Sequence, residues 1–137
     1  MRKAFFLALF VLAVAVPVLA QDAVKADPKH YKVEFENARV RVLRVHYGPK
    51  EKSVWHSHPA GVAIAVTDVN VKFNLPGGKN QDSNMKAGQT MWTPGGRHLP
   101  ENMSDSDFEV LLVELKTRKR KPAPKKTPDT TTPPSKQ

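Results

Sequence analysis

The chain of 137 residues contains no cysteine. Disulfide bonds, a cysteine nucleophile and a lipid-modified N-terminal cysteine are therefore excluded. Beyond the first 20 residues no segment has a convincing helical period. Stability must then come from the packing of a β-rich core, alone or together with a bound metal.

Residues 1–20 have the pattern of a secretory signal peptide. A basic start precedes an uninterrupted apolar run over residues 4–16, and small residues lead up to Gln21. The run is short for a membrane span, which needs about 20 apolar residues. We expect cleavage after Ala20 and a secreted or periplasmic mature chain, with an uncleaved anchor as the alternative.

The C-terminal end, residues 117–137, is rich in proline, lysine and threonine and has no large apolar residue. Such a segment buries too little surface to offset its ordering entropy, so we expect a disordered tail. Residues 116–137 hold eight basic residues and one acidic residue, whereas residues 21–115 hold twelve of each. A basic folded surface for nucleic acid is therefore not supported. We expect the tail to contact an anionic envelope surface weakly, or to be a solubilising spacer.

The intervening residues predict one all-β domain over residues 29–116, preceded by a linker over residues 21–28. Alternating or continuous apolar patterns indicate several short strands separated by turn signals such as Pro76-Gly77-Gly78. This spacing is typical of a sandwich or barrel. The expected strands are residues 31–36, 40–45, 61–67, 69–75, 90–93 and 108–115.

Three histidines are the strongest candidates for a functional site. His56 and His58 belong to the motif W-H-S-H-P, and His98 belongs to a second motif about forty residues later. Residues i and i+2 of a strand share a face, so the first pair would direct two imidazoles to one point. A third imidazole from the opposing sheet region would complete a site for iron, zinc, copper or nickel. The alternative is two surface histidines and one core residue.

The two motifs resemble those of the cupin superfamily, in particular small single-domain bacterial cupins. Gly48 followed by His56-x-His58 is similar to the first motif. Gly88, Pro94, Gly96, His98 and Asn102 follow the second, with one residue fewer between the glycine and the histidine. The resemblance covers about residues 29–116. It implies a double-stranded β-helix, that is, a jelly-roll barrel, with His56, His58 and His98 around one divalent metal.

One departure from the family's pattern concerns a carboxylate. The first motif usually carries a glutamate soon after its second histidine, whereas residues 59–65 contain none. The resemblance then implies three neutral imidazoles with open positions and a higher net charge, which favours an anionic ligand. Such sites occur in cupin oxygenases of the cysteine dioxygenase type. Alternation from His98 turns Glu101 away from the site and places Asn102 on its face, where Asn102 serves the barrel interior or the following turn.

The remaining histidines and the tryptophans have simpler expected roles. His30 and His46 match neither motif and are expected at the surface. Trp55 and Trp92 are expected in the core, with a pocket wall as the alternative. Pro100 predicts an irregular or edge strand near His98, and the scattered methionines predict packing.

Two functions from different classes follow from these patterns. The first is a metalloenzyme acting on a small molecule, such as an iron-dependent dioxygenase. The second is a non-enzymatic module of the cell envelope that binds a metal, a sugar or a phenolic ligand, and a structural protein with a vestigial site is a third. The metal (Fe, Mn, Ni or Zn) is left open, and no second catalytic group is evident. We also consider a homodimer, and we expect metal binding to weaken below roughly pH 6, near the histidine pKa.

Overall fold

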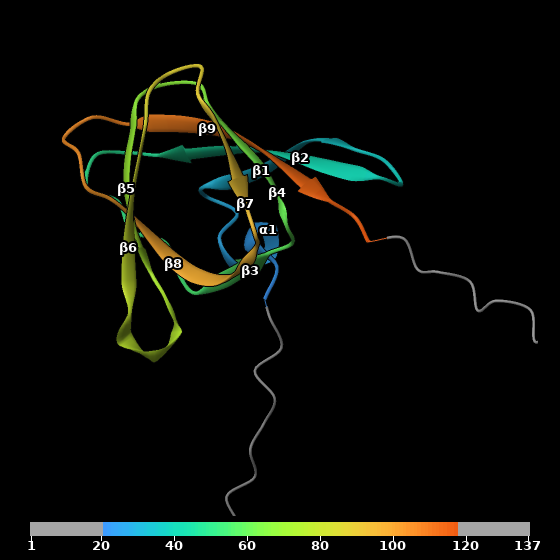
Figure 1. Cartoon of the computed structure of the whole chain (residues 1–137), viewed down its shortest axis with the longest axis horizontal. Coiled ribbons are helices and arrows are strands. Elements are labelled where there is room, and N and C mark those ends of the chain that lie inside the picture. The colour runs from blue at the N-terminus through green and yellow to red at the C-terminus, as the bar shows by residue number, and fades with distance from the viewer. Residues whose placement is uncertain (1–20, 118–137) are drawn as a thin grey trace, which may run out of the picture.

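The computed structural model describes residues 21–117, which form an all-β domain with one short helix (Figure 1). The predicted signal peptide, residues 1–20, and the tail from residue 118 onward lie outside the described residues. Within residues 21–117 no helix is long and apolar enough to cross a membrane. The elements are α1 (Ala23–Ala26), β1 (Tyr31–Glu36), β2 (Val40–Tyr47), β3 (His56–His58), β4 (Gly61–Ala65), β5 (Val69–Asn74), the 3-10 turn η1 (Pro76–Gly78), β6 (Asn80–Met85), β7 (Thr90–Thr93), β8 (Gly96–Asn102) and β9 (Phe108–Leu115).

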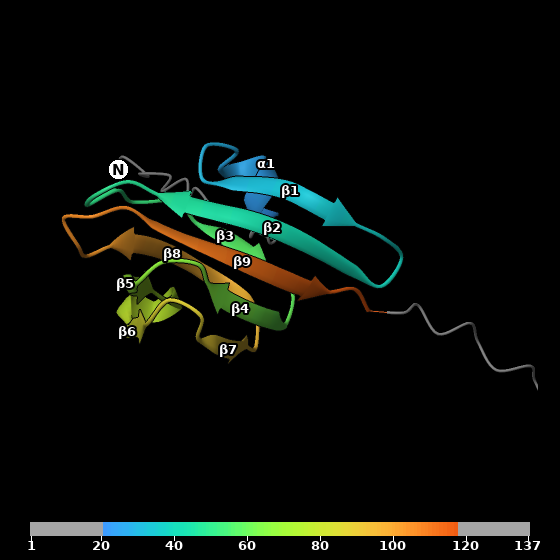
Figure 2. The same cartoon turned by 90° about the horizontal axis from the view of Figure 1, so that it is seen from above.

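The strands form two antiparallel sheets. The five-stranded sheet has the order β1-β2-β9-β4-β7 and the four-stranded sheet has the order β3-β8-β5-β6. Figure 2 shows the first sheet from β1, beside α1, down to β7, with β5 and β6 lying together at one side. Strands that are neighbours in a sheet are mostly distant in sequence, as in a jelly roll. The predicted all-β, double-stranded β-helix architecture is confirmed.

The core lies on the inner faces of both sheets. One cross-strand row of the five-stranded sheet places Leu43, Leu112 and Ala63 side by side, and they face the core between the sheets. The neighbouring row points outward and is also apolar. It runs across four strands through Phe35, Val42, Val113 and Val62. The outer face of this sheet therefore has an apolar row beside the ion-paired Arg44, Glu34 and Glu109, although an outer face is usually polar throughout.

Several strands follow the predicted ranges, but β6 does not appear in the sequence pattern. Its residues, NQDSNM, have a polar composition of low β-propensity, and only Ser83 and Met85 are buried. The strand forms because it pairs along its whole length with β5. Tertiary pairing therefore outweighs the local preference.

Of the two alternatives predicted for Pro100, an edge strand is wrong, whereas an irregular strand is confirmed. β8 lies between β3 and β5, and Pro100 pairs with Phe73 of β5. The pairing with β3 covers only Gly96 to His98, so the proline lies where regular pairing on that side has ended. A residue without an N–H group is tolerated at such a position.

Residues 21–28 are packed against the domain rather than forming a free linker, which corrects the predicted boundary. Asp22 accepts a hydrogen bond from the Val24 amide as the N-cap of α1. Ala23 is fully buried, and α1 contacts β1 and β3. The amide of Ser57 donates to the carbonyl of Gln21, so the segment covers the free edge of β3.

Candidate metal centre

Strand pairing brings the three predicted histidines together. His56 of β3 lies directly opposite His98 of β8, and His58 lies opposite Gly96. Paired residues project to the same side of a sheet, and His58 follows two residues after His56 on that side. The prediction that His98 comes from the opposing sheet is wrong, because β3 and β8 are neighbours in one sheet.

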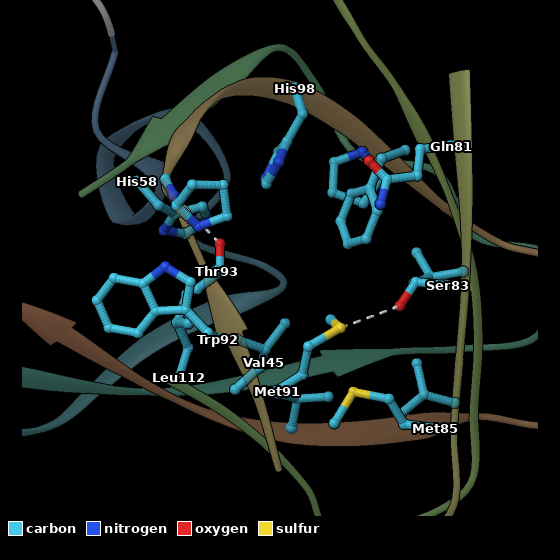
Figure 3. Close-up of a pocket in the computed structure, with 18 of the residues that line it drawn as sticks. Val45, His58, Gln81, Ser83, Met85, Met91, Trp92, Thr93, His98 and Leu112 are labelled. Carbon is cyan, nitrogen blue, oxygen red and sulfur yellow. Dashed lines mark hydrogen bonds between the residues drawn. The ribbon is translucent and has the colours of Figure 1, made fainter. Parts of the chain in front are cut away.

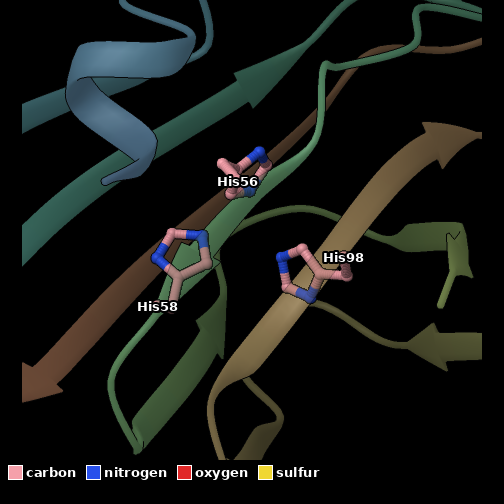
Figure 4. Close-up of side chains that lie close together, drawn as sticks. All are labelled: His56, His58 and His98. Carbon is pink, nitrogen blue, oxygen red and sulfur yellow. The ribbon is translucent and has the colours of Figure 1, made fainter. Parts of the chain in front are cut away.

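The three imidazoles turn toward one another between β3 and β8 (Figure 4). One nitrogen from each lies within 4.8 Å of the others, and His56 and His58 are buried. The Nε2 atoms of His56 and His98 are buried without a hydrogen-bond partner among the described residues. Unsatisfied buried nitrogens are unusual and need an explanation. A metal ion bound by the three imidazoles would supply one.

The other ring nitrogens of His56 and His58 are occupied by the protein. Nδ1 of His56 lies 2.8 Å from the carbonyl oxygen of Val54, and Nδ1 of His58 lies 2.6 Å from Oε1 of Glu114. A carbonyl or carboxylate accepts a proton held on Nδ1, which leaves Nε2 with its lone pair. This is the arrangement that metal-binding histidines usually have.

Glu114 of β9 is a site residue that the sequence analysis did not identify. Its side chain is 1% exposed, and its second oxygen accepts a hydrogen bond from Nε of Arg41 at 2.6 Å. Arg41 also contacts Asp22 at 2.5 Å. The only signal in the sequence is a glutamate at an inward position of an apolar strand, F-E-V-L-L-V-E-L. The first motif lacks a carboxylate. Glu114 places one beside the site, where it contacts the ring of His58 rather than the space between the three imidazoles.

Burial sets the protonation of the site. It lowers the pKa of His56 to about 4 and that of His98 to about 3, and the charge of His58 acts in the same direction. Burial works to raise the pKa of Glu114, but hydrogen bonds from His58 and Arg41 outweigh it and hold the pKa below its ordinary value. His56 and His98 are thus neutral and available as ligands at neutral pH. Protons therefore compete with a metal for these two rings only at a pH below that at which a free imidazole becomes protonated.

His30 is buried, and the prediction of a surface position is wrong. Its side chain is 6% exposed, its Nδ1 lies 2.6 Å from Oδ2 of Asp27, and its ring stacks on Tyr47 at 4.1 Å. Ser53 donates a hydrogen bond to Asp27 and lies 3.3 Å from Nδ1 of His56. Asp27, His30 and Ser53 therefore form a buried polar network next to the ring of His56. His46, in contrast, is exposed as predicted.

The second motif is held to the first by its turn and by Asn102. Gly95 and Gly96 have φ values of 77° and 116°, so the predicted tight turn with positive φ is confirmed. A Cβ atom at Gly95 would lie 2.6 Å from the carbonyl oxygen of His58. Asn102 is buried, donates to the carbonyl of Gly48 and accepts from Ser104 in the following turn. Both roles foreseen for Asn102 are thus present.

A cavity of about 350 Å³ opens between the sheets beside the histidines (Figure 3). His58 and His98 line it, whereas His56 lies behind them. Trp92 is 58% exposed and forms part of the wall, so its expected place in the core is wrong and the pocket alternative is correct. Glu101 faces away from the site, as predicted, and its carboxylate pairs with Lys72 at 3.5 Å.

Comparison with known proteins identifies the fold's relatives. No protein-family model matches the chain, and no curated protein sequence matches it. A cupin domain from Bordetella pertussis is similar in structure, with a TM-score of 0.59 and 27% identity over 64% of this chain and 92% of that chain. A cupin superfamily protein from Desulfitobacterium hafniense has a TM-score of 0.47 at 9% identity, covering 62% of this chain and 74% of that chain. A cupin-2 domain protein from Shewanella frigidimarina has a TM-score of 0.44 at 20% identity, covering 63% of this chain and 79% of that chain. With its jelly-roll topology and the similarity to the Bordetella domain, the chain belongs to the cupin superfamily.

Proposed function

We propose that the protein binds one divalent transition metal through Nε2 of His56, His58 and His98. The observation that carries the proposal is the pair of buried Nε2 atoms without partners, in rings whose spacing suits a single ion. Imidazole donors accept Fe, Mn, Ni or Zn, and availability decides among them. The residues present therefore fit a metal, and its identity is left to measurement.

The surrounding residues orient the ligands. Val54 and Glu114 hold the Nδ1 protons of His56 and His58, and Arg41 balances the charge of Glu114. A bound metal would supply Lewis acidity, or redox chemistry if it is iron. Among the described residues that line the cavity there is no Lys, Arg, Asp or Glu. A reaction in this cavity would therefore depend on the metal and its ligands rather than on a second charged acid or base.

The finer alternatives are a metalloenzyme that acts on a small molecule, such as an iron-dependent dioxygenase, and a non-enzymatic binding module of the cell envelope. The absence of a charged lining residue favours the binding module unless the metal is redox-active. We propose a secreted or periplasmic location on the basis of residues 1–20, with the tail as a weak contact to anionic surfaces. Oxygen consumption with candidate substrates separates the two functions.

We also propose that the outer face of the five-stranded sheet packs against a second copy of the chain. The outward row runs through Phe35, Val42, Val113 and Val62, and Phe35 is more than half exposed. Five strands about 4.8 Å apart and four to eight residues long present roughly 500 Å², which is below the ~800 Å² per partner of a standard interface and predicts a weak dimer. The Val113→Lys variant should sediment as a monomer and the native chain as a dimer. A monomeric native chain would refute this.

Metal content tests the main proposal. Protein purified from its native compartment should contain about one equivalent of a divalent transition metal by elemental analysis. The His58→Ala variant should lose it, whereas His46→Ala, which changes an exposed histidine away from the site, should retain it. A folded native protein that stays metal-free with iron, manganese, nickel and zinc in near-stoichiometric amounts would overturn the proposal.

A further inference from the structure

The cavity beside the histidines is lined mainly by apolar side chains. Most of its lining side chains are aliphatic, aromatic or thioether groups contributed by both sheets. In Figure 3, His58 and His98 lie at one end, Ser83 and Met85 lie along a side wall, and Met91 projects between them. A volume of about 350 Å³ falls at the lower end of the range for small-molecule sites. The space suits a small and largely apolar molecule.

The net positive charge of the metal-loaded site favours an anionic ligand. Three neutral imidazoles leave both positive charges of a divalent ion uncompensated. The nearest carboxylate, Glu114, lies behind His58 and is already paired with Arg41. No carboxylate lines the cavity among the described residues. The ligand or solvent must therefore supply the balancing negative charge.

The cavity offers few partners for further polar groups. Thr93 already accepts a hydrogen bond from the Gly95 amide, and Ser83 already donates to the sulfur of Met91 at 3.9 Å. Tyr47 is bonded to the hydroxyl of Tyr31 at 2.8 Å. Only Gln81, on an exposed part of β6, remains as a larger polar group. A polyhydroxylated ligand such as a sugar would bury hydroxyls without partners, at about 1–3 kcal/mol for each.

We infer that the ligand is a small molecule with an apolar body and one anionic oxygen group, a carboxylate or an ionised phenol, which binds the metal between His58 and His98. Its body lies against Phe73, Met85 and Met91. The inference rests on the proposed metal site, because only the metal supplies the positive charge.

Zinc-loaded protein and four probes test this ligand class, since zinc is redox-silent. Calorimetry at neutral pH would compare benzoate with benzamide, which is neutral, with acetate, which lacks the ring, and with gluconate, which is polyhydroxylated. Benzoate should bind at least about ten-fold more tightly than each of the other three. It should not bind the metal-free protein measurably. Competition between benzoate and 4-nitrophenolate then decides which anionic oxygen is preferred.

Two methionines provide a matched pair of variants. Met91 and Met103 are each 37% exposed, but only Met91 lines the cavity. Met91→Glu introduces a negative charge beside the apolar body and should weaken benzoate binding at least about ten-fold. Met103→Glu introduces the same charge outside the cavity and should leave it unchanged. Zinc affinity should be unchanged in Met103→Glu and should not fall in Met91→Glu, because the added carboxylate can only balance the charge of the ion.

The outcomes separate this inference from the proposed function. A native protein that binds no zinc refutes the metal site. A protein that binds zinc but prefers benzamide, acetate or gluconate to benzoate keeps the metal site and overturns the ligand class. Equal loss of benzoate binding in the two methionine variants would also overturn it, because the cavity would then not hold the probe.

Discussion

At the scale of single residues, Glu114 orients His58 and contacts Arg41, a role that no pattern in the sequence predicted. The three histidines could be predicted because i, i+2 spacing and a second motif are local patterns. Glu114 of β9 contacts His58 of β3, and the two residues are 56 positions apart in the sequence. Such a contact depends on sheet order, which no short pattern specifies.

The Glu114→Gln variant tests this role. The amide oxygen can still accept the proton on Nδ1 of His58, but the negative charge is lost. Metal affinity should fall about 10–100-fold, as measured by competition with a chelator. Glu109→Gln, on the same strand but paired with Arg44 near the surface, is the control. Unchanged affinity in folded Glu114→Gln protein would mean that the carboxylate only balances Arg41.

His30 illustrates a second error of single-residue reasoning. The sequence around it lacks a motif, but Asp27 and Tyr47 enclose the ring. His30→Ala would leave the buried Asp27 with one partner fewer, at about 2–4 kcal/mol of unfolding free energy. His46→Ala should change stability by no more than about 0.5 kcal/mol. Urea denaturation of the two variants measures the difference, and equal midpoints would contradict the assigned contacts.

At the scale of elements, the strands with alternating or continuous apolar patterns could be predicted, whereas β6 and α1 could not. Residues 31–36, 90–93 and 108–115 form strands over the ranges that their patterns indicate. The polar strand β6 depends on β5, and the four-residue helix α1 depends on packing against β1 and β3. Both gain their stability from tertiary contacts, so local propensity carried little information about them.

The turn between β7 and β8 is the element on which the site depends most. Gly95 and Gly78 have nearly equal φ values of 77° and 75°, but only Gly95 contacts another backbone segment. Both alanine variants carry the penalty of about 1–2 kcal/mol for positive φ. Gly95→Ala also forces its Cβ against His58 and Pro59, so it should lose about 2 kcal/mol more and bind metal more weakly. Thermal unfolding and metal titration measure both effects, and indistinguishable variants would refute this account.

At the scale of the whole molecule, acid should destabilise the metal-free domain. The pKa of His56 is lowered to about 4 and that of His98 to about 3, whereas both take ordinary values near 6.5 when unfolded. Between these values the unfolded chain binds more protons, so stability is full above about pH 6.5 and falls as the pH drops. Each ring contributes up to about 1.4 kcal/mol per pH unit. Denaturation midpoints that are flat from pH 7 to about pH 4 would contradict the burial of these rings.

The separation of charge between the domain and the tail leads to the last prediction. Residues 21–115 are formally neutral, whereas residues 116–137 carry a net charge of +7. Each basic residue near an anionic membrane contributes about 1 kcal/mol, screened by salt. Removing residues 117–137 should leave the melting temperature and metal content nearly unchanged, because the core and the three histidines lie before them. Truncation should abolish binding to anionic vesicles in co-sedimentation at low ionic strength. If the full chain shows no salt-dependent binding there, the tail is a spacer.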